Sequence, residues 1–181
     1  MTEPLAVAFA NTWYAVRGDE REGVGTPLDL AKWLDSQRLS AGVGEGGVGG
    51  GDVREFLTLR DAIRALLRAT TEGEALPEAA KATLNTASEQ APSWPALAGS
   101  ADSGYGVIEV SSADPLSAAR ARIARDAIAV LGGPLREDVR ACHAPGCVQY
   151  FVKDHPRREW CSAACGNRAR VARHYLKSKD S

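Results

Sequence analysis

Four cysteines constrain this 181-residue chain most, because all of them fall within residues 142–181. They are Cys142, Cys147, Cys161 and Cys165, in the pattern Cys-x4-Cys-x13-Cys-x3-Cys. Each close pair lets one short loop supply two ligands, and the thirteen intervening residues let the chain return to complete a tetrahedron. Four thiolates leave no open position for a substrate or water, which is typical of structural zinc. The sequence therefore predicts one structural Zn²⁺ held by these four cysteines.

Several alternatives to this zinc site remain open from the spacing alone. Iron also accepts four thiolates, and four buried free thiols would need no metal. A redox pair is disfavoured because neither pair is Cys-x-x-Cys. His143 or His155 would have to replace a cysteine, and His143 directly follows a ligand, so the all-cysteine set is preferred.

No apolar run approaches the roughly 20 residues of a membrane span, and the start lacks a signal peptide's basic region. We therefore expect no membrane association and a cytoplasmic protein with reduced thiols.

The distribution of charge divides the chain into two parts. Residues 136–181 hold ten Lys or Arg and five Asp or Glu, whereas residues 1–135 hold twelve and eighteen. The overall charge of −1 thus conceals a +5 tail and a −6 body. We expect two domains, 1–134 and 135–181, with a hinge at Gly132–Pro134. A basic segment on an acidic body points to an anionic partner for the tail.

The body is expected to be mainly helical, with one or two short strands, which makes the chain mainly α within the α+β class. Helices are predicted over 27–39, from 53 onwards, over 77–89 and over 116–131, and capping signals precede three of them. Those signals are Thr26-Pro27, Asp52 with Glu55, and Asp114-Pro115. Residues 5–14 fit a helix or a strand equally well. Residues 105–110 have the composition of a strand, whereas residues 42–51 and 91–104 are predicted loops. The helix over 116–131 is expected to expose Arg120, Arg122 and Arg125.

The tail is expected to form a small treble-clef-like zinc finger. Residues 144–146 suit a tight turn, 149–153 a strand, and 158–160 the second strand of a hairpin. Ser162 is a plausible cap for a last helix, whose Val171 and Tyr175 we expect to pack back on the hairpin. That helix is basic, and a helix fixed by zinc suits phosphate contacts or the DNA major groove. The candidate DNA contacts are Arg168, Arg170, Arg173 and Lys177 on the helix, with Arg157 and Arg158 in the hairpin.

Particular residues in both halves resemble a known family. The finger resembles the CGNR zinc finger in Cys165-Gly166-Asn167-Arg168, in Tyr150-Phe151 with Asp154, and in Arg158 with Trp160-Cys161-Ser162. The body resembles the ABATE domain in Phe9, Asn11 and Thr12, in Leu30 with Trp33-Leu34, and in the segment 60–67. His155 departs from the family, which commonly has Ser or Thr there. The resemblance implies a bacterial, stress-induced transcription regulator with a DNA-binding finger and a sensor or ligand-binding body.

We therefore expect a zinc-dependent regulator that binds DNA. A small effector would meet Asn11, Thr12, Trp13 and Arg64, for each of which a structural role is the alternative. A homodimer would suit paired DNA half-sites. The competing function is a zinc-finger adaptor that binds an acidic protein surface, since treble clefs serve both purposes. An enzyme is not expected, because the three histidines all lie in the tail beside the metal motif and no catalytic set is recognisable.

Overall fold

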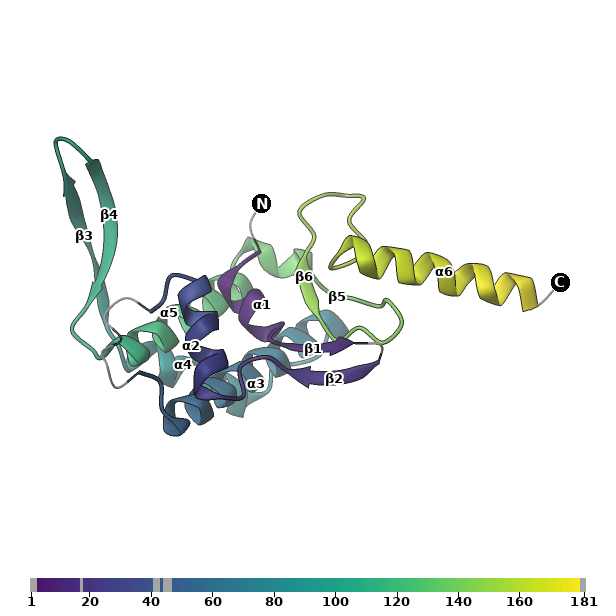
Figure 1. Cartoon of the computed structure of the whole chain (residues 1–181), viewed down its shortest axis with the longest axis horizontal. Helices are drawn as coiled ribbons and strands as arrows, with labels where there is room; N and C mark the ends of the chain where they lie inside the picture. Colours follow the sequence, from purple (N-terminus) through teal and green to yellow (C-terminus); the bar gives the residue numbers. More distant parts are fainter. Residues whose placement is uncertain (1–2, 17, 41–42, 44–46, 180–181) are drawn as a thin grey trace.

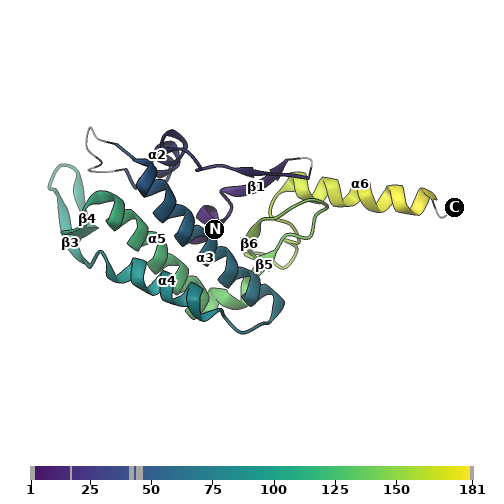
Figure 2. The ribbon, with the colours of Figure 1, turned by 90° about the horizontal axis from the view of Figure 1, so that it is seen from below.

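The protein was analysed as a computed structural model that describes residues 3–16, 18–40, 43 and 47–179, with side chains as far as 175. A layer of helices forms the body, three two-stranded antiparallel hairpins attach to it, and the last helix projects from one end (Figures 1 and 2). This architecture confirms the expected mainly α class with short strands. Within the described part of the chain, no helix has both the length and the apolar character that crossing a bilayer requires.

The body helices bury one continuous apolar core. They are α1 (Leu5–Ala10), α2 (Pro27–Ser36), α3 (Gly50–Glu72), α4 (Glu78–Glu89) and α5 (Pro115–Gly132). Phe9 of α1 stands edge-on to Phe56 of α3, with 6.1 Å between ring centroids, and lies 4.8 Å from the ring of Trp33. Leu66 and Ile123 are almost completely buried beside them. Apolar residues three and four apart on α3 thus provide the stripe that the other helices cover.

Capping side chains fix where the helices begin. The Thr26 hydroxyl accepts a hydrogen bond from the Asp29 amide at 3.2 Å, and Asp114 accepts two amides at the start of α5, as predicted. The prediction for α3 was wrong by three residues, because the helix begins at Gly50 and Asp52 lies in its first turn. Its carboxylate accepts from the Gly49 amide at 2.8 Å, so it closes the turn from inside the helix. Much of the predicted glycine-rich loop (41–42 and 44–46) lies outside the described residues.

The body carries more strand than expected. Residues 5–14 divide into α1 and β1 (Trp13–Val16), which pairs with β2 (Asp19–Glu22). Residues 91–104, predicted as a loop, instead form β3 (Ser93–Ser100), which pairs along its whole length with β4 (Gly104–Ser111). Pro, Ser and Gly suggested irregular structure, but the apolar residues of β4 supply cross-strand partners that a local prediction does not see.

Two arginines of the body helices are buried. Arg120 was predicted on the surface of α5 but is 93% buried, with its guanidinium 5.6 Å from the Phe56 ring and 2.8 Å from the Glu55 carboxylate. Arg60 of α3 is buried as well and donates to both carboxylate oxygens of Glu22, which ties the β1–β2 hairpin to the body. Arg122 is exposed, as expected.

Candidate metal centre and its contacts with the body

The first two cysteines flank a tight turn between the two strands of the third hairpin. Cys142 follows β5 (Val139–Ala141), and the Cys147 amide donates to the carbonyl oxygen of Ala144 at 2.9 Å. Gly146 has φ +67°, a left-handed conformation that side chains rarely adopt, so glycine is needed here. This is the predicted turn, and it directs both thiols to the same side.

The other two cysteines lie at the start of α6 (Ala163–Lys179). The Ser162 hydroxyl accepts a hydrogen bond from the Cys165 amide at 3.3 Å, as the predicted cap should. Cys165 is therefore in the first helical turn, and Cys161 immediately precedes the helix. The positive end of the helix dipole lies beside these thiols and favours their thiolate forms.

The four sulfur atoms meet in one cluster. The Sγ–Sγ distances are 3.8 Å between Cys147 and Cys161, 3.4 Å between Cys161 and Cys165, and 3.7 Å between Cys165 and Cys147. All four Sγ atoms, including that of Cys142, lie within 4.8 Å of one another. A tetrahedron with Zn–S bonds of about 2.3 Å has sulfur atoms about 3.8 Å apart. The four sulfur atoms thus have the spacing of a four-thiolate ligand set for one Zn²⁺.

The histidines stand apart from this cluster. His143 and His155 are both exposed, and the His155 ring nitrogen Nδ1 accepts the Arg157 amide at 3.1 Å. Among the described residues, the metal-binding group consists of the four cysteines without a histidine. The departure of His155 from the family pattern therefore leaves the ligand set intact.

The surroundings of the thiols bear on how the metal is taken up. Burial raises the pKa of Cys147 to about 11 and also raises the pKa of Cys161. At Cys165 burial acts in the same direction, but hydrogen bonds from Ser162 and the neighbouring thiols outweigh it and lower the pKa. Without metal, the thiols of Cys147 and Cys161 thus favour their neutral forms. Zinc must displace their protons, because only thiolates bind it tightly.

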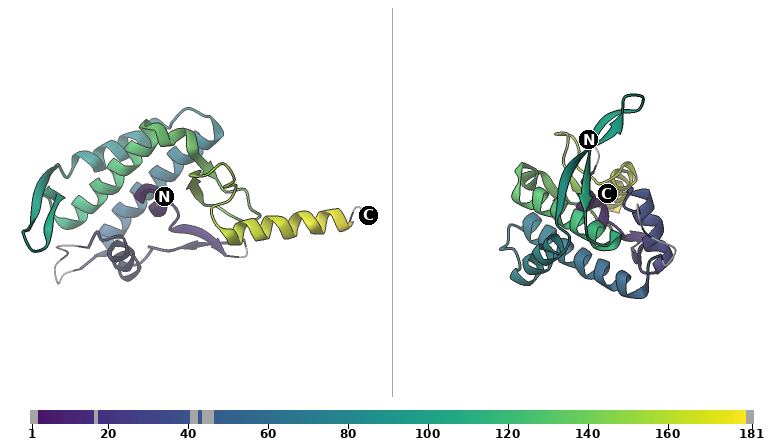
Figure 3. Two further views of the ribbon diagram at one scale, coloured as in Figure 1. Left: turned by 90° about the horizontal axis from the view of Figure 1, so that it is seen from above. Right: turned by 90° about the vertical axis from the view of Figure 1, so that its left-hand side faces the viewer.

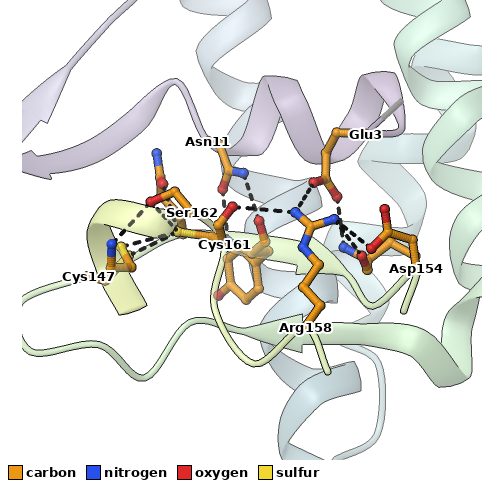
Figure 4. A network of polar contacts seen from close by, with 11 residues as sticks. Glu3, Asn11, Cys147, Asp154, Arg158, Cys161 and Ser162 are labelled. Carbon is orange, nitrogen blue, oxygen red and sulfur yellow. Dashed lines mark hydrogen bonds and ion pairs between the residues drawn. The ribbon is translucent and has the colours of Figure 1, made fainter. Parts of the chain in front are cut away.

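The hairpin of the finger is not the one that the sequence suggested. β6 (Tyr150–Val152) pairs with β5, which precedes the first cysteine, and residues 158–160 form no strand. The reason lies at the other edge of β6. There the Asn11 side-chain amide donates to the Tyr150 carbonyl and accepts from the Tyr150 amide, both at 2.8 Å. The body thus occupies the edge that a second strand would need (Figure 4).

A second group of contacts extends along the same edge of β6. The Glu3 carboxylate accepts from the Val152 amide at 2.7 Å, and Arg158 donates to the Val152 carbonyl at 3.0 Å. Arg158 also donates to Glu3 at 2.9 Å and lies 3.3 Å from the Asp154 carboxylate (Figure 4). Glu3 lies just before α1 of the body and Arg158 lies in the finger, so their ion pair joins the two parts.

The four residues proposed for an effector lie at or near this junction. Arg64 of α3 donates to the carbonyls of Ala10 and Val148 at 2.8 and 3.0 Å, and its guanidinium lies 5.4 Å from the Tyr150 ring. Thr12 is buried and donates to the Phe9 carbonyl at 2.7 Å. Trp13 lies 5.5 Å from the guanidinium carbon of Arg60. These contacts are internal to the protein, and ligand binding by the four residues stays a prediction.

The six candidate DNA contacts fall into two groups. Arg157, Arg170 and Arg173 are exposed, whereas Arg158 and Arg168 are partly buried. Arg168 donates to the Cys165 sulfur at 3.1 Å, so it supports a metal ligand instead of facing solvent. Lys177 lies in α6, but its side chain is outside the described part of the structure. Asn167 accepts a hydrogen bond from Arg170, so its side chain has a partner within α6.

The predicted packing of α6 against the hairpin was wrong. Val171 and Tyr175 are 69% and 60% exposed, and the helix runs away from the body (Figures 1 and 2). The finger's small core holds Phe151 and Ala144 beside the cysteines. Trp160 covers the first turn of α6, where a Cβ on Gly166 would lie 3.0 Å from the indole ring. The helix is anchored through its first two turns, where Cys165 and Ala169 are buried, and the described side chains from Arg170 to Tyr175 are mostly exposed.

Comparison with known protein families agrees with the geometry. A family model named ABATE, with the description "Putative stress-induced transcription regulator", matches residues 3–134, and the CGNR zinc finger model matches residues 139–178. A search of curated proteins produced no match. The ABATE model spans most of the chain, and the finger model contains all four clustered cysteines. The chain therefore belongs to the ABATE family and carries a CGNR zinc finger able to bind one Zn²⁺.

Proposed function

We propose that this protein is a bacterial, cytoplasmic transcription regulator that binds DNA through its zinc-dependent finger. The observation that carries the proposal is α6, an exposed basic helix that projects from the body and is anchored at one end by the cysteine cluster (Figure 1). Both matching families are regulator and zinc-finger families and not enzyme families.

The charge of α6 suits a polyanion. The helix carries three arginines and two lysines and has no acidic residue between 163 and 179. The remainder of the chain is acidic, with a net charge of −6 over residues 1–135. Phosphate attracts the helix and repels the body, which orients the protein on DNA. A partner of mixed charge would gain little from this separation.

The shape of α6 suits the major groove. Seventeen residues make a helix about 25 Å long at about 1.5 Å per residue, and the major groove admits one α-helix. Arg170 and Arg173 are exposed on consecutive turns, and Arg157 is exposed in the loop before the helix. We propose these three with Lys177 as the DNA contacts. Arg158 and Arg168 instead support the finger through Glu3 and Cys165.

The contacts at β6 suggest how the body would influence the finger. Asn11, Arg64 and Glu3 hold the strand that leads from the second cysteine toward the third. An effector that shifts α1 or α3 would therefore shift the finger. We propose that the candidate effector residues Asn11, Thr12, Trp13 and Arg64 belong to this coupling.

The proposal is tested by the salt dependence of DNA binding. Fluorescence anisotropy with labelled duplex DNA gives the slope of log K against log salt for zinc-loaded protein and for Arg173→Ala. Loss of one phosphate contact should weaken binding and reduce the slope by about 0.9. Arg122→Ala is the matched control, because Arg122 is also exposed on a helix but belongs to the body.

The result separates the regulator from the adaptor. An unchanged affinity and slope in Arg173→Ala removes Arg173 from the interface. Absence of any salt-dependent DNA binding by the zinc-loaded protein contradicts the proposal and favours an acidic protein surface as the partner of α6.

A further inference from the structure

The β3–β4 hairpin is the part of the body that the other elements leave uncovered. It projects beyond the helices at the end of the molecule opposite α6 (Figures 1 and 3). An isolated two-stranded hairpin is only marginally stable in water, since it needs a third strand or a helix to cover an apolar face. The β1–β2 hairpin has such support from Arg60, whereas among the described residues the side-chain hydrogen bond from a helix to β3–β4 lies at the base of the hairpin, where Arg125 of α5 donates to Glu109.

Both faces of this hairpin are apolar and exposed. In the antiparallel register, Ala96 lies opposite Ile108 on one face and Leu97 lies opposite Val107 on the other. The large apolar side chains exposed here are Trp94 (49%), Leu97 (75%), Tyr105 (68%), Val107 (76%) and Ile108 (49%). Single exposed apolar residues are ordinary, but a contiguous patch marks an interaction site.

The edge of β4 is also open to pairing. Exposed edge strands normally carry lysine or proline that blocks another strand. β3 has Pro95, but β4 reads Gly-Tyr-Gly-Val-Ile-Glu-Val-Ser and has neither residue. Its one charged residue, Glu109, already forms an ion pair with Arg125 at 2.9 Å. A new strand can therefore approach β4 without meeting an unpaired charge.

We propose that the β3–β4 hairpin is a homodimer interface, in which β4 pairs antiparallel with β4 of a second copy about a two-fold axis. The product is a four-stranded sheet with the order β3-β4-β4-β3. A strand that meets its own copy is self-complementary by symmetry. The hairpin lacks the charge that would select an acidic or basic partner, because residues 91–113 contain only Asp102 and Glu109 as charged residues. Neutral, apolar and strand-forming, it matches itself.

The exposed area on β4 fits a weak dimer. A fully buried aromatic side chain covers about 150–250 Å², and the transfer energy of a large aliphatic one corresponds to about 60–120 Å². Scaled by their exposed fractions, Tyr105, Val107 and Ile108 of β4 offer on the order of 250 Å² per copy beside the new strand pair. A standard interface buries about 800 Å² per partner, so this pairing predicts a dimer that forms only at high protein concentration.

The position of the hairpin makes this dimer compatible with the rest of the molecule. The hairpin extends beyond the acidic body, so two copies can join without bringing their bodies into close contact (Figure 3). Helix α6 lies at the other end and stays uncovered (Figure 2). The inference is independent of the proposed DNA binding, and the dimer would present two basic helices far from each other.

Analytical ultracentrifugation of the zinc-loaded full chain tests this interface. The parent protein should sediment as a dimer at about 100 μM. Val107→Lys places like charges together near the two-fold axis and should raise the dimer Kd by about 100-fold or more. Val171→Lys is the matched control, because Val171 on α6 is 69% exposed and Val107 is 76% exposed. It should leave the dimer unchanged.

Zinc content and helical circular dichroism show whether each variant is folded, and neither should change, because the replaced side chain is exposed. A monomeric parent protein overturns the proposal. If that monomer binds phosphatidylcholine vesicles, the apolar hairpin has a lipid surface as its partner and the proposal is still overturned. A dimer that persists in folded Val107→Lys, or one that dissociates in Val171→Lys instead, also overturns it.

Discussion

Replacing Asn11 by alanine should weaken the junction between body and finger more than any single surface contact would. The Asn11 amide forms two 2.8 Å hydrogen bonds with the backbone of Tyr150. Tyr150 is buried, so its amide and carbonyl would both lose their partners at once. Leaving a buried polar group unsatisfied costs about 1–3 kcal/mol, which gives at least about 2 kcal/mol for the pair. Typical domains are stable by only about 5–15 kcal/mol.

Urea unfolding of the zinc-loaded protein measures this loss. With a slope of about 2–3 kcal/mol per molar urea, the midpoint should fall by about 1 M. Asn85→Ala is the matched control, because Asn85 is exposed on α4 and alanine favours helix. A urea midpoint of Asn11→Ala equal to that of Asn85→Ala would refute the reasoning. Asn11 would then have no structural role at the junction, and ligand binding would be the remaining prediction for it.

Three further predictions concern the metal centre. Burial raises the thiol pKa of Cys147 to about 11, so zinc binding releases protons. The zinc affinity should therefore fall as pH falls, by up to about tenfold per pH unit for each proton released. Chelator competition at two pH values measures this affinity, and an affinity that does not depend on pH contradicts the prediction. Arg168→Met removes the hydrogen bond to the Cys165 sulfur and should weaken zinc binding by about 10–100-fold, whereas Arg170→Met should not. Gly166→Ala places a Cβ 3.0 Å from Trp160 and should lower stability by about 1–3 kcal/mol in thermal melting; an unchanged melting temperature would mean that the indole moves aside freely.

The features that the sequence predicted correctly are those with short-range signals. The cysteine spacing, the turn at 144–146 and the Ser162 cap each depend on residues a few positions apart, and the structure has all of them. Thr26 and Asp114 likewise cap their helices locally. Such signals are reliable because the chain has little freedom to satisfy them differently.

The features that it missed depend on partners far along the chain. Residues 158–160 were expected to pair with β6, but Asn11 and Glu3, 139 and 149 positions away from their β6 partners, occupy that edge first. Arg120 was placed on a surface by helical spacing, yet Glu55 and Phe56 of α3 cover it. Arg158 was predicted as a DNA contact from its charge, and that role stays a prediction; its ion pair with Glu3, 155 positions away, has no local signal in the sequence.

The same reasoning explains what family resemblance contributed. Asn11 and Arg64 were predicted as effector contacts with a structural role as the alternative, and the structure places both beside the strand β6. Their motif holds one part of the chain against the other. The family motifs in the body and in the finger therefore identify positions that match the family, but the contact between Asn11 or Arg64 and β6 is evident only from the tertiary structure.

Selection of genomic DNA fragments tests the central claim most directly. Zinc-loaded protein is incubated with sheared DNA from its own source at near-physiological salt, and the retained fragments are sequenced beside a chelator-treated sample. Binding through a zinc-held α6 predicts that the retained fragments share a sequence motif and that chelation abolishes their recovery. Uniform recovery without a motif, or recovery that persists after zinc removal, would contradict the account.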